Sequence, residues 1–285
     1  MNRRTMLGMM GAAALPPFAL GAGVAHAGVE LDPANPDHVL LMLRKLAHSA
    51  GDEPIFWWIR TTRHGLVDSA FTPLWGQNGG AIFATRDVDD QGSYEISVIV
   101  INFTVNPETG QPIETFKNPY TNKEMELQTF GGTDPIRVVY RSGGNTLGSG
   151  RGVPPGYKIT ASGVSVGPAV IEGDDVWVRS DNVFRMEPNS PDDGRLRQVN
   201  DWSTYHGSLK DVASPDIESA PATWAFNDIN TWPSWMRMED RPGNYMGRGA
   251  GRKVFSIDDM PSSWRRLMAE RHPDILNDPL GALTG

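Results

Sequence analysis

The 285-residue chain contains no cysteine. Without thiols there can be no disulfide, no thiolate nucleophile, no cysteine-ligated iron–sulfur cluster and no covalently attached c-type haem. The six histidines are scattered singly and lack the spacing of metal ligands. We therefore expect no cofactor and no metal site.

Basic runs and long apolar runs are also missing. The chain has 26 Lys and Arg against 34 Asp and Glu, a formal net charge of −8. An acidic chain without a basic segment lacks the electrostatic footprint of a protein that binds nucleic acid or anionic membranes. The most apolar stretch, near the N-terminus, is broken by Gly and Pro well short of the roughly 20 residues that a membrane-spanning helix needs. We expect neither a nucleic-acid partner nor a stable membrane span once a leader is removed.

Residues 1–27 have the composition of an export leader. Arg3 and Arg4 precede an apolar stretch over residues 6–24, and Ala25-His26-Ala27 supplies the small residues that a signal peptidase recognises. The paired arginines favour the twin-arginine type, with an ordinary secretory leader as the alternative. The prediction is a periplasmic or secreted protein with one β-rich domain over residues 28–285.

The remaining sequence predicts a mainly antiparallel β-barrel, lipocalin-like in form, with a helix before it and another after it. Asn35 and Pro36 suit the start of the first helix, and a second is expected near residues 262–271. Residues 94–105 are apolar at both alternating sets of positions, which is typical of a strand covered on both faces. Short apolar segments and frequent turn signals follow, including an expected turn at residues 180–182.

No strong catalytic motif is present: there is no phosphate-binding Gly-rich loop, no HExxH and no Gly-x-Ser-x-Gly. The strand predicted at residues 199–206 carries the best candidates. Alternation places Trp202 and His206 on one face, and Asp201 and Tyr205 on the other. If the Trp202 face points into the barrel, His206 becomes an inward general acid or base. The alternative is a histidine that only caps the following turn.

Arg60 is the second candidate, because on an extended strand it shares a face with Phe56 and Trp58. A cation among aromatic rings needs a partner, since an unpaired buried charge costs several kcal/mol. That partner is either a ligand carboxylate or enolate, or an acidic side chain on a facing strand such as Glu95.

Tryptophans supply the candidate ligand-binding residues. Residues 224–238 hold three of them and are interrupted by Pro233, which predicts an ordered aromatic loop. Such a loop either presents rings to an apolar ligand at the barrel mouth or fills the barrel end as core. The candidates are Trp58, Trp177, Trp202, Trp224, Trp232 and Trp235.

Several short motifs resemble those of the family called domain of unknown function 1838. They are Trp57-Trp58 and residues 106–110 and 118–121 in the first half, then residues 232–236, 241–243, 251–253 and 260–261. Asn122 stands where that family's pattern suggests glycine. The resemblance covers about residues 32–273 and implies a single β-rich domain in exported proteins, but it implies no reaction and no catalytic residue.

Two functions therefore compete. In the first, the protein binds a mostly apolar or aromatic small molecule in an aromatic-lined cavity. In the second, it is a cofactor-independent lyase, isomerase or cyclase. There His206 would act with Asp201 or Tyr205, and Arg60 would stabilise developing negative charge.

Overall fold

A computed structural model describes residues 29–127, 130–142, 146–147, 157–190 and 195–284. The predicted leader, residues 1–27, lies outside this range. Among the described helices, none has the length and apolar character needed to cross a membrane.

The chain is mainly β. Its strands are β1 (Ile55–Val67), β2 (Ala70–Asp87), β3 (Tyr94–Val105), β4 (Thr115–Lys117), β5 (Glu124–Glu126), β6 (Phe130–Tyr140), β7 (Thr146–Leu147), β8 (Tyr157–Val166), β9 (Val170–Glu172), β10 (Asp175–Pro188), β11 (Arg197–Ser208), β12 (Ala222–Asn230) and β13 (Asn244–Val254). The helices are α1 (Pro36–Ala47), α2 (Leu209–Ala213), α3 (Ser262–Arg271), α4 (Pro273–Asn277) and α5 (Pro279–Thr284), with short 3-10 turns at Ser234–Met236 and Ile257–Asp259.

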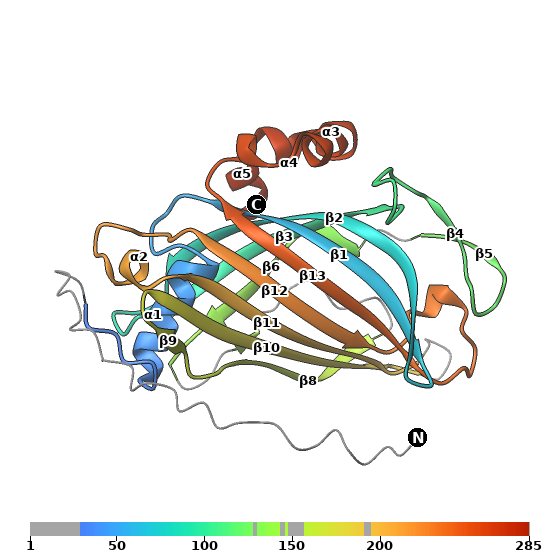
Figure 1. The fold of residues 1–285 in the computed structure, drawn as a ribbon, viewed down its shortest axis with the longest axis horizontal. Helices are drawn as coiled ribbons and strands as arrows, with labels where there is room; N and C mark the ends of the chain where they lie inside the picture. Colours follow the sequence, from blue (N-terminus) through green and yellow to red (C-terminus); the bar gives the residue numbers. More distant parts are fainter. Residues whose placement is uncertain (1–28, 128–129, 143–145, 148–156, 191–194, 285) are drawn as a thin grey trace, which may run out of the picture.

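One large antiparallel sheet forms the body of the protein. Its strand order is β7-β6-β3-β2-β1-β13-β12-β11-β10-β8, with β9 paired to β10, while β4 and β5 form a separate hairpin. The sheet curls strongly about its length into a half-barrel (Figure 1). The mainly β, antiparallel prediction is confirmed at this level.

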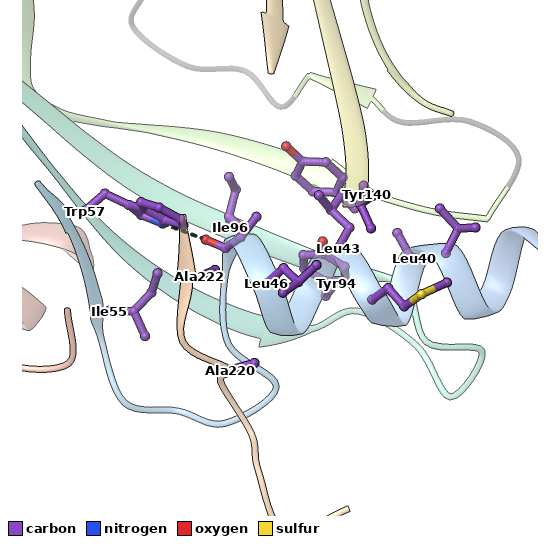
Figure 2. Packing of buried hydrophobic residues seen from close by; sticks show 14 of the residues in the cluster. Leu40, Leu43, Leu46, Ile55, Trp57, Tyr94, Ile96, Tyr140, Ala220 and Ala222 are labelled. Atoms are coloured by element: carbon purple, nitrogen blue, oxygen red, sulfur yellow. Dashed lines mark hydrogen bonds between the residues drawn. The ribbon is translucent and has the colours of Figure 1, made fainter. Parts of the chain in front are cut away.

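Helix α1 closes one end of the concave face. Asn35 caps it by accepting a hydrogen bond from the Asp37 backbone N–H at 2.9 Å. The apolar side of α1 packs against aromatic side chains of the sheet (Figure 2), and the Trp57 indole N–H donates to the carbonyl of Ala47 at 2.9 Å. The N-terminal helix predicted from the capping pattern is therefore present, and its role is to fill the curl of the sheet.

The convex face is covered over β1–β3 by the C-terminal helices α3, α4 and α5 (Figure 1). Trp264 of α3 is fully buried there against Ile99, Ile101 and Phe103 of β3. On the opposite face of the same strand, Ile96 belongs to the cluster under α1. The prediction that residues 94–105 are covered on both faces is confirmed.

Two local predictions were wrong. Residues 180–182 are not a turn but the middle of β10, because strand pairing on both sides holds Ser180–Asn182 extended despite their turn-forming composition. Residues 224–230 are not a loop but part of β12, where Trp224, Phe226 and Asp228 alternate with smaller or polar side chains. Pro233 lies after the end of that strand and therefore does not interrupt it.

Candidate ligand site on the concave face

The concave face changes from aromatic to polar with distance from α1. The pairing of β1, β13, β12 and β11 aligns their concave side chains into rows that cross the four strands. The aromatic row contains Trp224 and Tyr205, which are directly paired. Four residues further along β12 and β11, beyond a row that contains Phe226 and Ser203, a polar row contains Arg63, Asp228 and Asp201.

A buried ion pair occupies the centre of the polar row. The Arg63 guanidinium donates to the Asp228 carboxylate at 2.5 Å and to the Gln77 side-chain carbonyl at 2.8 Å, and it lies over the ring of Tyr245. Asp228 also accepts from the Gly247 backbone N–H at 2.8 Å and from the Asn230 amide at 2.7 Å. A buried carboxylate with several donors and a buried cation with two acceptors satisfy the rule that interior charges be paired.

Asp201 lies directly opposite Asp228 on the neighbouring strand but has a different environment. Removal from water raises the pKa of its carboxyl to about 6, and the Asp228 charge adds to this rise. The Ser203 hydroxyl, which donates to Asp201 at 3.0 Å, and the Arg63 charge act in the opposite direction. Asp201 therefore exchanges its proton near neutral pH, a property typical of functional carboxyls.

The aromatic row forms a stacked wall. Tyr205 stacks on Trp224 with ring centroids 5.8 Å apart, and Trp57 meets both rings edge-on. Burial raises the pKa of the Tyr205 phenol well above its usual value, so it stays a neutral donor. The buried Trp224 indole N–H has no hydrogen-bond partner within the described part of the chain. Asp201, Tyr205 and Trp224 are only half-buried, so solvent reaches this wall.

Glycines on β13 make room for these side chains. Gly247, Gly249 and Gly251 occupy successive concave positions. A Cβ at Gly247 would lie 2.2 Å from Arg63 Nη1, and one at Gly249 would lie 2.2 Å from Phe226 Cε1. A larger residue at either position would push the ion pair or the aromatic row out of place.

The four predicted catalytic residues are divided between the two faces. Asp201 and Tyr205 lie on the concave face, whereas His206 and Arg60 lie on the convex one, together with the ligand-binding candidate Trp202. The His206 ring stacks on Trp177 with centroids 4.9 Å apart, and its Nε2 lies 2.8 Å from the Asp175 carboxylate. The structure thus does not bring His206 together with Asp201 or Tyr205, because residues an odd number of positions apart on one extended strand point to opposite faces.

Arg60 shares the convex face with Phe56 and Trp58, as alternation predicted, but this face is the outside of the half-barrel and Arg60 is exposed. The expected partner Glu95 instead pairs with Arg86 at 2.9 Å. Glu95, which was one of the options for a partner of Arg60, does not pair with it, because β2 separates the two residues and its Arg86 is directly opposite Glu95.

The six candidate tryptophans occupy three separate places. Trp224 is on the concave face, while Trp58, Trp177 and Trp202 are on the convex one. Trp232 and Trp235 belong to a third cluster at the far end, around Trp75 and the β4–β5 hairpin.

Sequence reasoning missed Trp57, Arg63 and Asp228. The signal for the first two was present, since Trp57 and Arg63 fall on the same alternating set of β1 as Ile55 and Ile59. Nothing local linked Arg63 to Asp228, which lies 165 residues away along the chain. Within the described ranges, no cluster of three or more His, Cys, Asp or Glu side chains is arranged to hold a metal ion.

Comparison with known proteins supports the family resemblance. Residues 179–282 match the model of the family described as "Protein of unknown function (DUF1838)". This segment includes β11, β12 and β13, and therefore Asp201, Asp228 and the β13 glycines. Searches of curated proteins and of solved structures each gave no significant match.

Proposed function

The chain is a member of the DUF1838 family, and we propose that it binds a mostly apolar or aromatic small molecule on its concave face. The body of the ligand lies against the Trp224–Tyr205 wall, and a polar group of the ligand reaches the Asp201 carboxyl. The observation that carries this proposal is the partly exposed aromatic wall on the same concave face as the polar row, with an unpartnered Trp224 N–H among the described residues. Ligand sites typically combine apolar walls with a few convergent polar groups.

Tryptophans on opposite faces of the sheet provide a matched test. The full-length protein purified from its host is analysed by native mass spectrometry for a retained small molecule, and is titrated with the uncharged fluorescent probe N-phenyl-1-naphthylamine. Trp224→Ala should lose both the retained molecule and probe binding, whereas Trp177→Ala on the convex face should keep them. Equal behaviour of the two variants, or no binding by the native protein, would refute the concave site.

A second function is favoured by one specific observation, the Asp201 pKa of about 6. A carboxyl that gains and loses a proton near neutral pH suits general acid/base catalysis, and the neutral Tyr205 phenol, four residues along the same face of β11, can donate a hydrogen bond to the ligand. The protein would then act as a cofactor-independent lyase, isomerase or cyclase on its ligand. Asp201 and Tyr205 keep their predicted roles in this scheme, while His206 and Arg60, on the other face, have none.

Proton exchange distinguishes catalysis from binding. The retained ligand, incubated with the protein in D2O, should gain deuterium at a carbon position if Asp201 removes and returns a proton there. Asp201→Asn should abolish this exchange while leaving the ligand bound. A ligand that remains bound without deuterium uptake in the native protein would exclude the catalytic function and leave the binding function intact.

Export to the periplasm is part of the proposal, as is closure of the half-barrel into a lipocalin-like barrel. Cleavage after Ala27 predicts a mature N-terminus at Gly28, which the intact mass of the protein from the periplasmic fraction checks. Changing Arg3 and Arg4 together to lysine should block export if the leader is of the twin-arginine type, and should have little effect on an ordinary secretory leader.

A further inference from the structure

The convex face carries a groove that the concave ligand site does not use. It has a volume of about 590 Å³ and runs over β1, β13 and β12. It lies on the side of the sheet opposite the Trp224–Tyr205 wall. The convex side chains that line it include Arg60, Thr62, His64, Asn227, Arg248 and Ala250.

The strand register explains why the surface is hollow there. Arg60 pairs with Ala250, and Ala250 pairs with Ala225, so a row of very short side chains crosses two strands. The next row contains the longer side chains of Arg248 and Asn227. The two short alanine side chains beside a row of long ones form the groove in the convex surface.

Two arginine side chains that are not paired with a carboxylate face this groove. Arg60 and Arg248 are exposed, and neither guanidinium forms an ion pair or a hydrogen bond with any other residue that the structure describes. They are diagonal neighbours on paired strands, since Arg248 is opposite Thr62. Like charges at such positions repel each other, and a bound anion would remove this repulsion. The chain as a whole has a net charge of −8, so these two arginines differ in sign from its overall charge.

Uncharged groups complete the lining. Asn227 and Thr62 contribute an amide and a hydroxyl that can donate hydrogen bonds. Burial lowers the pKa of His64, with a further contribution from the Arg248 charge, so its ring is a neutral donor or acceptor at pH 7. At the end of the convex row that contains Arg248 and Asn227, Trp202 pairs with Asn227 and leaves 45% of its surface exposed.

We propose that this groove is a second ligand site, which binds a small organic oxyanion with a planar body. The oxyanion, a carboxylate or a phosphate, lies between Arg60 and Arg248, and the planar body extends over Asn227 toward the exposed ring of Trp202. Arginine suits this role because its planar fork of N–H donors matches both kinds of oxyanion in a bidentate geometry. The exposed indole supplies a flat apolar surface for the rest of the ligand.

Calorimetric titration of the full-length protein tests the proposal with three probes of one shape: benzoate, phenyl phosphate and the uncharged benzamide. Benzoate, phenyl phosphate or both should bind saturably, and benzamide should bind at least tenfold more weakly. Their relative affinities identify which oxyanion the groove prefers. Arg60→Gln and Arg248→Gln should each weaken anion binding about tenfold or more, through loss of a charge-assisted hydrogen bond.

Two controls keep the outcome specific to this groove. Arg266→Gln removes a surface charge on α3 and should leave the affinity unchanged, which separates a local site from the general field of the protein. Trp224→Ala should also leave anion binding intact, so failure of the concave site and failure of the groove are distinguishable. The absence of saturable binding, or binding insensitive to both Arg60 and Arg248, would overturn the proposal.

Discussion

Replacing Asp201 by asparagine should stabilise the folded protein at neutral and alkaline pH. The Asp201 carboxyl is largely removed from water, close to the Asp228 carboxylate, and its pKa rises from 3.8 to about 6 on folding. Ionisation of this group therefore opposes folding. Asparagine has nearly the same shape, its oxygen can still accept the hydrogen bond from Ser203, and it cannot ionise.

The two pKa values determine the sign and the size of the effect. Below pH 3.8 the carboxyl is protonated in both states, so the variant and the native protein should be equally stable. Between pH 3.8 and 6 the folded state retains a proton that the unfolded state has released, and native stability falls as the pH rises. Above pH 6 the difference is constant at about 3 kcal/mol as an upper value, or about 1–3 kcal/mol once the partial exposure of Asp201 to solvent is considered.

Urea unfolding of the native protein and of Asp201→Asn, followed by tryptophan fluorescence between pH 4 and 8, measures this difference. The variant should gain stability relative to the native protein as the pH rises, and its melting temperature at pH 8 should be higher by roughly 2–4 °C per kcal/mol. Asp90→Asn, which removes an exposed loop carboxylate, is the control for net charge. Equal stabilities of native protein and Asp201→Asn at pH 8 would refute the reasoning that burial raises this pKa.

Three further changes test other parts of the structure. Asp228→Asn leaves the Arg63 guanidinium buried without its carboxylate, so the free energy of unfolding should fall by about 3–5 kcal/mol in urea titrations; a loss below 1 kcal/mol would contradict this. Gly249→Ala places a Cβ 2.2 Å from an aromatic carbon on β12 and should cost about 1–3 kcal/mol, whereas Gly163→Ala, whose Cβ meets nothing within 4 Å, should cost little; equal melting temperatures would be the contrary result. Burial lowers the pKa of His48 from 6.5 to about 3, so the stability present above pH 6.5 is lost as the pH falls toward 3. His48→Gln should therefore flatten the fall of the urea midpoint between pH 6.5 and 4, and an unchanged slope would exclude His48 as its cause.

Local sequence patterns predicted some elements well. Asn35 and Pro36 marked the start of α1 correctly, since capping depends on residues adjacent in the chain. Residues 94–105 were recognised as a strand covered on both faces because both alternating sets are apolar. The same reasoning failed at residues 180–182 and 224–230, where polar or proline-flanked segments are held extended by strands on both sides.

The candidate site was predicted only in part. Alternation along β11 correctly separated Asp201 and Tyr205 from Trp202 and His206, but it did not show which set faces inward. Both sets contain an aromatic ring and a titratable group, so composition did not distinguish them. The direction in which the sheet curls made Asp201 an interior residue and left His206 paired with Asp175 outside.

The sequence by itself determined the absence of thiol chemistry, the antiparallel β character and the family resemblance, because each depends on composition or on residues close together in the chain. Only the tertiary structure decided that Arg63 meets Asp228, that Asp201 lies opposite that pair, and that glycines on β13 leave space for both. These contacts join strands far apart in the sequence. Burial and the nearby charges shift the Asp201 pKa only after the chain has folded, and no local pattern encodes that environment.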